Sequence, residues 1–580
     1  MRPRPECRQL EKQNLVVRFA GEGGQGVVTS AEGLAQAASQ VGYHVLTYAT
    51  FPSQILGGPT WTQTRVSTTA VLSAGDELDL LVAFNREAYD THVAEVRSGG
   101  VVIYNSGEFQ LEVDEHSFGI PFDELAKSTG NSRAANMVVI GAIAHLVNFA
   151  QEHLEGFVKS RFSRGRANDE QIIESNIKAL TLGRSHAKES GFSLGTLAEA
   201  IPSNHPQILV KGNEAISLGA TAANLECYVG YPISPATTIL VWMEKNLVSE
   251  GKFVYQVSSE IEAIASLLGA GFAGKKAMTA TAGPGISLMS EGLGLAWMAE
   301  IPAVVVDVQR GGPATGLPTK TEQSDLFACM HPAHGDVKLP VIAPGSVEEC
   351  FYAAVAALNW AERYQGPVIL MSEMAMAERA QNIPKPDLSK INIEKRIVYQ
   401  GANGYQRYEG NSLSPMPVPG GPGSYIANGS EHDGMGDTTH LGQRHVEMTE
   451  RRFGKLRLLE DGTFESENES ESIALVPWGG TKGPAKEAFD QLSADGIPIG
   501  WYYTMFLNPL PPMLLEDLLR KDLVIVPELN YQGQWASMLR SYGIKAEAIT
   551  QYTGLPFKVR DLVQRVKELM DSHQRKVVKV

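Results

Sequence analysis

The sequence predicts a multidomain α/β protein, and three observations support this. The chain has 580 residues, which is too long for one ordinary domain. Apolar strand-like runs alternate with amphipathic helical runs in three separate regions. Stretches rich in Gly, Pro, Ser and Asn divide those regions. A hydrophobic content of 43% and a charged content of 20% are typical of a soluble globular protein.

The first region carries the strand-like runs LVVRFA, HVLTYATF, DLLVAF and GVVIYN within residues 15–105, separated by the helical runs TSAEGLAQAASQ and REAYDTHVAEV. This alternation predicts a parallel-sheet α/β unit, which a helix over 131–150 completes. A polar, helix-rich segment follows over 160–190. We therefore place a first domain at 1–195 and a linker at 196–206, where the sequence is rich in turn-forming residues.

The second region contains the apolar runs FVYQV, AMTATA, AVVVDV and PVILMSE and predicts an α/β domain over 207–378. A Gly/Pro-rich excursion over 379–470 comes next. Its central part, 400–445, is either a disordered linker or an ordered segment that wraps another surface, and its embedded Tyr and Met residues favour the ordered alternative. A third α/β domain is expected over 471–580, ending in a helix.

Charge and cysteine usage exclude several classes of function. The formal net charge of −15 argues against a nucleic-acid or anionic-membrane surface. No apolar run reaches the roughly 18 residues of a membrane span, and the first residues lack a hydrophobic signal core, so we expect a cytoplasmic protein. The scattered cysteines argue against a metal site or an iron–sulfur cluster built from this chain alone; they are Cys7, Cys227, Cys329 and Cys350.

A glycine cluster follows the first strand-like run and precedes a helical one, as in dinucleotide-binding turns. It reads Gly21-Glu-Gly23-Gly24-Gln-Gly26. The next strand does not end in the acidic residue that would hold a ribose hydroxyl, which argues against NAD. The remaining alternatives are a tight turn without a ligand and a turn that faces a phosphate or CoA.

Three side chains in the second region follow predicted strands, where ligands collect in α/β sheets. Ser234 stands in YPISPATT between two prolines and either caps a helix or meets a ligand. Glu260 begins a helix after FVYQV, where a carboxylate is also stabilised by the helix N-terminus alone. Arg310 enters a Gly-rich loop after AVVVDV and either binds a carboxylate or forms a surface ion pair. Because all three residues lie at one edge of the same predicted sheet, the ligand-binding alternatives are favoured over the structural ones.

Four long motifs in the second region resemble those of a known protein family. YPISPATT, SSEIEAIASLLGAGFAG, TATAGPGISLMSEGLGLA and QRGGPATGLPT resemble the α subunit of a 2-oxoacid:ferredoxin oxidoreductase. GEGGQGVVTSAEGLAQA, DLLVAFN and NSRAANMVVIGA resemble the γ subunit of that family, fused in front. RYEGNSLSPMPVPG and GSEHDGMGD resemble the subtype that acts on 2-oxoglutarate. The resemblance implies a γ-type domain, a thiamine-diphosphate pyrimidine-binding-type domain and a transketolase C-terminal-type domain.

The resemblance also implies the chemistry. The family decarboxylates a 2-oxoacid with thiamine diphosphate, passes electrons to an iron–sulfur cluster and the acyl group to CoA. It implies that Glu260 activates the aminopyrimidine of the cofactor, with Tyr231 and Pro232 beside the cofactor. Arg310 and Thr319 match substrate-side positions, and Ser234 stands where the family usually has Thr. Glu262 is expected to be a helix-start charge of little catalytic importance.

Two expected parts are missing from the sequence, because it has neither a G-D-G motif nor cluster-ligand cysteines. The resemblance implies that a β subunit supplies the Mg²⁺–pyrophosphate site and the [4Fe–4S] cluster, in an (αβ)₂ complex that reduces ferredoxin. CoA is expected near Gly23, Gly24 and Gln25, and the 400–445 segment is a candidate for wrapping a neighbouring subunit. The alternatives are a subunit acting on pyruvate or a broad range of 2-oxoacids, and a non-catalytic scaffold for a catalytic partner.

Overall fold

The computed structural model describes residues 11–52, 57–112, 115–410 and 413–578. Cys7 and the other residues among the first ten lie outside the described residues. The same holds for most of the N-terminal segment that lacks a hydrophobic signal core. The chain forms two compact units, one of residues 1–210 with 379–385 and one of residues 211–378 with 386–580. No helix in the described ranges is long and apolar enough to span a membrane.

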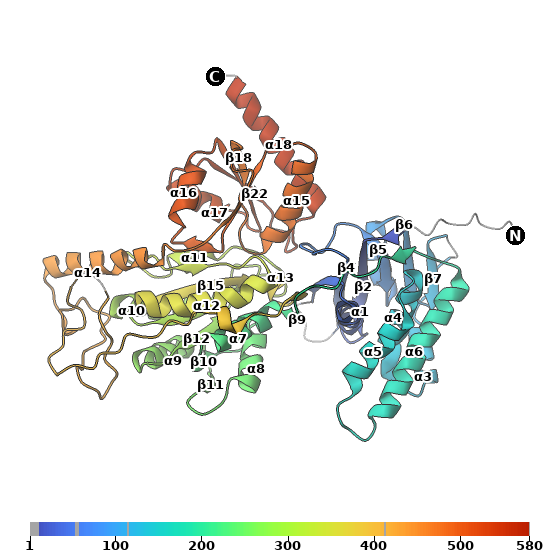
Figure 1. Cartoon of the computed structure of the whole chain (residues 1–580), viewed down its shortest axis with the longest axis horizontal. Helices are drawn as coiled ribbons and strands as arrows, with labels where there is room; N and C mark the ends of the chain where they lie inside the picture. Colours follow the sequence, from blue (N-terminus) through green and yellow to red (C-terminus); the bar gives the residue numbers. More distant parts are fainter. Residues whose placement is uncertain (1–10, 53–56, 113–114, 411–412, 579–580) are drawn as a thin grey trace. The chain divides into compact units, whose positions relative to one another are not determined.

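The first unit is built on an eight-stranded sheet (Figure 1). In sheet order its strands are β7 (Ser117–Ile120), β6 (Val96–Asn105), β5 (Leu78–Ala83), β2 (Asn14–Glu22), β4 (Pro59–Ser67), β3 (His44–Thr50), β16 (Ala380–Pro384) and β9 (Gln207–Lys211). Two short strands, β1 (Glu11–Lys12) and β8 (Thr196–Leu197), pair beside it. Its helices are α1 (Val27–Val41), α2 (Arg86–His92), η1 (Val93–Glu95), α3 (Phe122–Ser128), η2 (Ser132–Ala134), α4 (Ala135–Leu146), α5 (Gln151–Phe162) and α6 (Asp169–Ser190).

The prediction of a parallel sheet is wrong for this unit. β4 lies between β2 and β3 and runs antiparallel to both, whereas β2, β5 and β6 are parallel. This strand was not predicted, because its sequence PTWTQTRVS is largely polar and contains no apolar run. Thr62, Gln63 and Thr64 are nevertheless buried, since both faces of the sheet are covered at this point.

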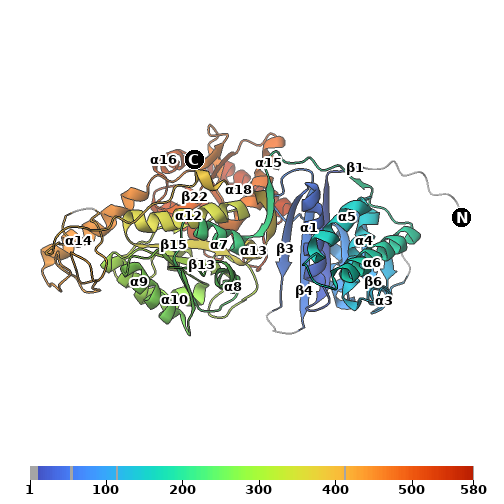
Figure 2. The same cartoon turned by 60° about the horizontal axis from the view of Figure 1, so that its bottom comes forward.

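Helices α1, α4, α5 and α6 share one hydrophobic core with the sheet (Figure 2). Two glycines allow α4 and α6 to approach closely. A Cβ atom on Gly141 would lie 2.0 Å from the carbonyl oxygen of Leu180, and one on Gly183 would lie 1.9 Å from that of Val138. Any larger side chain at either position would force the two helices apart.

The second unit begins with a seven-stranded sheet. In order its strands are β11 (Phe253–Gln256), β10 (Cys227–Gly230), β12 (Ala277–Thr281), β13 (Ala303–Gln309), β15 (Pro367–Glu373), β14 (Val341–Ile342) and β20 (Phe506–Asn508). All neighbouring pairs are parallel except β14 with β20. The accompanying helices are α7 (Gly212–Ala222), α8 (Thr237–Asn246), α9 (Glu260–Phe272), α10 (Gly283–Ala299), α11 (Leu326–Met330), α12 (Val347–Tyr364) and α13 (Met374–Ala377).

The terminal part of this unit has a five-stranded sheet in the order β17 (Glu465–Glu467), β19 (Gly500–Tyr503), β18 (Ile473–Leu475), β21 (Leu523–Glu528) and β22 (Ala546–Thr550). Its helices are η5 (Gly479–Thr481), α15 (Lys482–Ala494), α16 (Pro512–Leu519), α17 (Gln534–Ser541) and α18 (Val559–Val578). In Figure 1, α15, α16 and α17 surround this sheet, and α18 runs outward to the C-terminus.

The Gly/Pro-rich excursion is divided between the two units. Its first residues form β16 in the first unit, and the remainder is an arm of the second unit, which includes η3 (Leu388–Lys390), α14 (Gly442–Gly454) and η4 (Lys455–Leu459). We call residues 386–459 the arm. Tyr408 and Met416 in it are buried, as expected of the ordered alternative.

A buried carboxylate anchors the arm. Glu300 follows α10 and accepts hydrogen bonds from Arg451 at 2.8 and 3.1 Å and from Lys455 at 2.9 Å. Arg407 lies 3.9 Å from the same carboxylate. Burial alone would raise the pKa of Glu300, but these three cations outweigh it and hold that pKa well below its usual range.

Candidate active site

Strands β10, β11, β12 and β13 are parallel neighbours, so their carboxyl ends meet at one edge of the sheet. Ser234 follows β10, Glu260 follows β11 and Arg310 follows β13. Nη1 of Arg310 donates a hydrogen bond of 2.7 Å to the carbonyl oxygen of Ser234, and Glu260 attracts Arg310 electrostatically. The three side chains that the sequence singled out therefore lie around one site.

Glu260 and Glu262 share the first turn of α9 but differ in their surroundings. Ser259 is the N-cap, and its Oγ accepts the N–H of Glu262 at 3.2 Å. The exposed carboxylate of Glu262 accepts the N–H and Oγ–H of Ser258 at 2.8 and 2.6 Å, and these bonds lower its pKa. Glu262 thus serves as the capping carboxylate, as its helix-start interpretation anticipates.

The Glu260 carboxylate is 5% exposed and forms no hydrogen bond with any residue in the described part of the chain. It lies against bare backbone at the start of α10. A Cβ atom on Gly285 would lie 2.8 Å from Cγ of Glu260, 3.0 Å from its Oε1 and 1.9 Å from Oγ1 of Thr281. A buried carboxylate with hydrogen-bonding capacity to spare needs a polar partner, and the missing Cβ lets Glu260 pack directly against the backbone at the start of α10.

Arg310 begins a tight loop. The N–H of Leu317 donates to the carbonyl oxygen of Gly311 at 2.8 Å, and that of Gly311 donates to Lys320 at 3.0 Å. Gly316 has a φ of 49°, and a Cβ atom there would lie 2.2 Å from the Gly311 carbonyl oxygen, so this turn requires glycine. Thr319 is half-buried in the turn that closes the loop.

The Arg310 side chain is only 8% exposed, and its Nε has no hydrogen-bond partner among the described residues. Burial lowers the pKa of Arg310, whereas Asp325 and Glu260 act to raise it. The surface ion-pair alternative for Arg310 is therefore wrong. A guanidinium with a free buried donor suits an anionic ligand.

The capping alternative for Ser234 is also wrong. Helix α8 begins at Thr237 with Ala236 at its N-cap and has no side-chain cap. The Ser234 side chain is exposed, so its hydroxyl is available to a ligand. Tyr231 is 37% exposed and Pro232 is partly exposed in the same segment.

Comparisons with known proteins show which family this chain belongs to. The family model described as pyruvate flavodoxin/ferredoxin oxidoreductase, thiamine diP-bdg, matches residues 218–451, and the model described as pyruvate ferredoxin/flavodoxin oxidoreductase matches residues 16–186. Over 95% of its length the chain is 32% identical to the 2-oxoglutarate oxidoreductase subunit KorA of Mycobacterium tuberculosis, covering 91% of that relative. The chain belongs to the 2-oxoacid:ferredoxin oxidoreductase family.

A solved member of the family agrees over nearly the whole fold. The 2-oxoglutarate:ferredoxin oxidoreductase from Magnetococcus marinus, with 2-oxoglutarate, coenzyme A and succinyl-CoA bound, matches with a TM-score of 0.90 and 37% sequence identity. The match covers 96% of this chain and 100% of that chain. The 2-oxoglutarate synthase subunit KorA of Methanocaldococcus jannaschii is 36% identical over 55% of this chain and 88% of its own length. The predicted family and multidomain α/β fold are confirmed.

In this oxidoreductase chain the N-terminal glycine turn lies in the first unit, between β2 and α1. Gly23 and Gly24 are exposed, and Gly26, with a φ of 89°, is the N-cap of α1. Oε1 of Gln25 accepts the N–H of Glu22 at 2.8 Å and Nδ2–H of Asn85 at 3.3 Å, so Gln25 braces the turn. The exposed backbone suits the predicted contact with an anion.

Sequence reasoning missed a group of carboxyls beside Arg310, namely Asp307, Glu322 and Asp325. Asp307 is the acidic residue within the apolar strand AVVVDV, and this position was a usable signal because a carboxyl in such a strand is buried. Burial, and then the nearby Asp325, raise the pKa of Asp307 well above its usual range. Burial and then Glu322 raise the pKa of Asp325 to about 6, against the effect of Arg310.

The terminal part of this oxidoreductase chain holds the segment that follows the Arg310 loop. The N–H of Gln323 donates to the carbonyl oxygen of Leu529 at 2.7 Å, and Oε1 of Gln323 accepts the N–H of Leu529 at 3.0 Å. Asn530 and Gln534 add bonds to the carbonyls of Gln323 and Ser324. The terminal domain therefore fixes the backbone beside the site.

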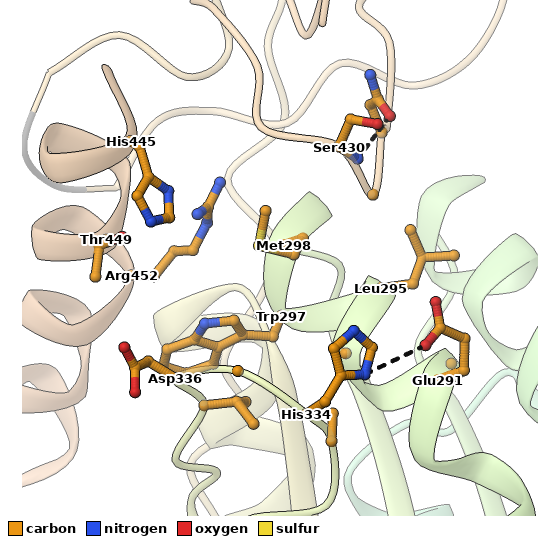
Figure 3. A pocket seen from close by; sticks show the side chains of 17 residues that line it. Glu291, Leu295, Trp297, Met298, His334, Asp336, Ser430, His445, Thr449 and Arg452 are labelled. Carbon is orange, nitrogen blue, oxygen red and sulfur yellow. Dashed lines mark hydrogen bonds and ion pairs between the residues drawn. The ribbon is translucent and has the colours of Figure 1, made fainter. Parts of the chain in front are cut away.

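A pocket of about 810 Å³ lies at the opposite end of α10 from Glu260, between that helix, residues 333–337 and the arm with its helix α14 (Figure 3). Its cationic side chains already have acidic partners. Arg452 donates to Glu431 at 2.7 Å, and His334 lies 3.9 Å from Glu291. Trp297 forms part of the wall. This pocket is separate from the Glu260 site.

Proposed function

We propose that this chain is the α subunit of a CoA-dependent 2-oxoglutarate:ferredoxin oxidoreductase. The enzyme would convert 2-oxoglutarate and CoA to succinyl-CoA and CO₂ while reducing ferredoxin. The observation that carries this proposal is the agreement, over 96% of the chain, with the Magnetococcus marinus enzyme that holds 2-oxoglutarate, coenzyme A and succinyl-CoA. In this assignment CoA meets the exposed backbone at Gly23 and Gly24, next to Gln25.

The residues around Glu260 fit thiamine diphosphate. The Glu260 carboxylate lacks a hydrogen-bond partner among the described residues, Glu260 packs against the bare backbone of Gly285, and Tyr231 and Pro232 are accessible on the loop that follows β10. When bound, this cofactor supplies the carbon that attacks the keto group and the electron sink that decarboxylation requires. Glu260 would hold a proton at the pyrimidine ring nitrogen and so keep the ring in its reactive form.

The substrate would bind at the same edge. Arg310 offers a guanidinium whose Nε is buried and unpaired, which matches a carboxylate. Ser234 and Thr319 would supply hydroxyl donors to the keto or carboxylate oxygens. Because the Ser234 carbonyl fixes Nη1 of Arg310, the guanidinium is already oriented before the substrate arrives.

We further propose a β subunit that carries the Mg²⁺–pyrophosphate site and the [4Fe–4S] cluster, in an (αβ)₂ complex. A surface suited to such a partner borders Glu260. Large apolar side chains are exposed on β11, α9 and α10, namely Phe253, Tyr255, Ile261 and Leu288. Exposed apolar groups concentrated beside a catalytic residue are typical of a subunit interface.

The decisive experiment measures methyl viologen reduction by the anaerobically purified complex with CoA present. We expect a strong preference for 2-oxoglutarate over pyruvate and 2-oxobutyrate. Equal or higher activity on the monocarboxylates would instead support a pyruvate or broad-range enzyme, a second candidate that the pyruvate-named family models favour. No CoA-dependent reduction by an intact, cluster-loaded complex would remove the enzyme assignment and leave the scaffold alternative.

A further inference from the structure

Three carboxyl groups near Arg310, those of Asp307, Glu322 and Asp325, have no part in the mechanism above. Arg310 is buried and forms no ion pair with any residue that the structure describes, yet Asp325 and Glu260 both attract it through space. A buried cation without a nearby counter-charge is costly, so the charges that balance it determine how an anionic ligand binds.

Asp325 is held rigidly in this environment. Its N–H donates to Oε1 of Gln309 at 3.2 Å, and its carbonyl oxygen accepts the N–H of Cys329 at 2.9 Å. Its side chain lies over the first residue of α10, where a Cβ atom on Gly283 would be 2.7 Å from Oδ2. Oδ2 is buried and has no hydrogen-bond partner among the described residues. Asp325 therefore lies at the same sheet edge as Arg310, since its backbone N–H is bonded to the residue that precedes Arg310, and its buried Oδ2 has no donor among the described residues.

The ionisable groups that act on Asp325 and Arg310 come from β13, from the loop that follows it and from α9. On β13, Asp307 accepts the Sγ–H of Cys329 from α11 at 3.4 Å, and burial, followed by the nearby Asp325, raises the pKa of Asp307 well above its usual range. Glu322 on the same loop repels the Asp325 carboxylate. From α9, Glu260 acts on Arg310, and α10 offers only Gly283. The raised pKa of Asp325, about 6, brings its ionisation close to neutral pH.

We infer that Asp325 supplies counter-charge to Arg310 through space in the free site, without a direct ion pair, and that it takes up one proton from solvent when a substrate carboxylate binds to Arg310. This inference rests on the substrate role proposed for Arg310. The physical reason is that two carboxylates beside one guanidinium in a dry site repel each other, so the arrival of one favours protonation of the other. Asp325 is then a positioning residue that sets the charge of the site without touching the substrate.

The test uses the intact complex and N-oxalylglycine, an unreactive dicarboxylate analogue of 2-oxoglutarate. We expect the wild-type inhibition constant to weaken by up to tenfold per pH unit above about pH 6, because binding consumes a proton. In Asp325→Asn the constant should be independent of pH and tenfold or more tighter than wild type at pH 8. The control Glu322→Gln should keep the pH dependence but move its midpoint to lower pH.

Calorimetry on the wild-type complex in buffers of different ionisation enthalpy measures the same event directly, and does not require Asp325→Asn to assemble. Uptake of close to one proton per site at pH 7 is the expected result. A pH-independent inhibition constant without proton uptake would overturn the inference, even if Arg310→Lys still weakens binding. Unchanged binding by Arg310→Lys would overturn the Arg310 assignment itself, and this inference with it.

Discussion

Glu260 and Glu262 are two carboxylates in one helical turn, and their surroundings give them different tasks. Glu262 is exposed and bonded to Ser258, whereas Glu260 is buried beside Gly285 without a partner. We predict that Glu260→Gln lowers the turnover number by about 10²–10⁴-fold or more, because an amide cannot hold the pyrimidine proton. Viologen reduction by the assembled complex measures this effect.

Glu262→Gln is the matched control for that prediction. It should cost no more than about 1 kcal/mol of stability through the weakened helix cap and leave turnover within about twofold of wild type. A Glu260→Gln complex with wild-type turnover would contradict the catalytic role of Glu260 and favour the scaffold alternative.

Arg310→Lys tests substrate recognition separately from cofactor activation. Lysine keeps the charge but loses the planar set of donors, one of which is tied to the Ser234 carbonyl. We expect KM for 2-oxoglutarate to rise by about tenfold or more, with a smaller change in the turnover number. Steady-state kinetics over a range of substrate concentrations measures both, and an unchanged KM would contradict a two-point carboxylate contact.

The site was predictable from the sequence to the extent that its residues follow strands. Ser234, Glu260 and Arg310 each come within a few residues of the end of a run that forms a parallel strand, so they were expected at one edge of the sheet. Asp325 could not be placed in the same way. It lies 16 residues after the end of β13, in a long loop, and its position depends on Gln309, Cys329 and the terminal domain, which no local pattern encodes.

At the scale of elements, the prediction of strands failed where a buried strand consists mainly of polar residues. β4 is rich in Thr and Gln, and its insertion between β2 and β3 makes the N-terminal sheet mixed. The second sheet was easier because AVVVDV and PVILMSE are apolar on both faces, as a parallel sheet covered by helices requires.

The arm is held to the second unit chiefly through Glu300, so its attachment should depend on that charge. We predict that Glu300→Gln destabilises the arm by about 3–5 kcal/mol, because Arg451 and Lys455 would remain buried without their counter-charge. Limited proteolysis within residues 413–441 should become faster. Glu431→Gln serves as a comparison, since its partner Arg452 also borders an open pocket and the expected loss is smaller.

The same ion cluster predicts an acid limit. The pKa of Glu300 is depressed in the folded chain, so its contribution to stability is complete above its ordinary value of 4.5 and is lost as pH falls through the lower folded value. Proteolytic release of the arm should therefore increase below about pH 4.5 in wild type. In Glu300→Gln this part of the pH dependence should be missing, and an unchanged acid profile would contradict the anchor.

At the scale of the whole molecule, the chain leaves its N-terminal unit at β9 and returns to it with β16 more than 160 residues later. That returning strand pairs with β3. Asn382 completes the join, because its Oδ1 accepts the N–H of Val45 at 2.8 Å and its Nδ2 donates to the carbonyl oxygen of Tyr43 at 3.1 Å. The stability of the first unit thus depends on a segment that family matching and domain prediction both assign elsewhere.

We predict that Asn382→Ala destabilises the N-terminal unit by about 1–3 kcal/mol, since it leaves buried backbone groups of β3 unpaired at what becomes a weakened sheet edge. Calorimetry of the full chain should show the unfolding transition of this unit at a lower temperature. The arm, which Glu300 anchors, should remain as resistant to proteolysis as in wild type. Asp387→Ala, which removes only an exposed cap just beyond the strand, is the control and should leave that transition in place. Equal shifts for both variants, or a loss confined to the second unit, would mean that β16 does not stabilise the N-terminal sheet.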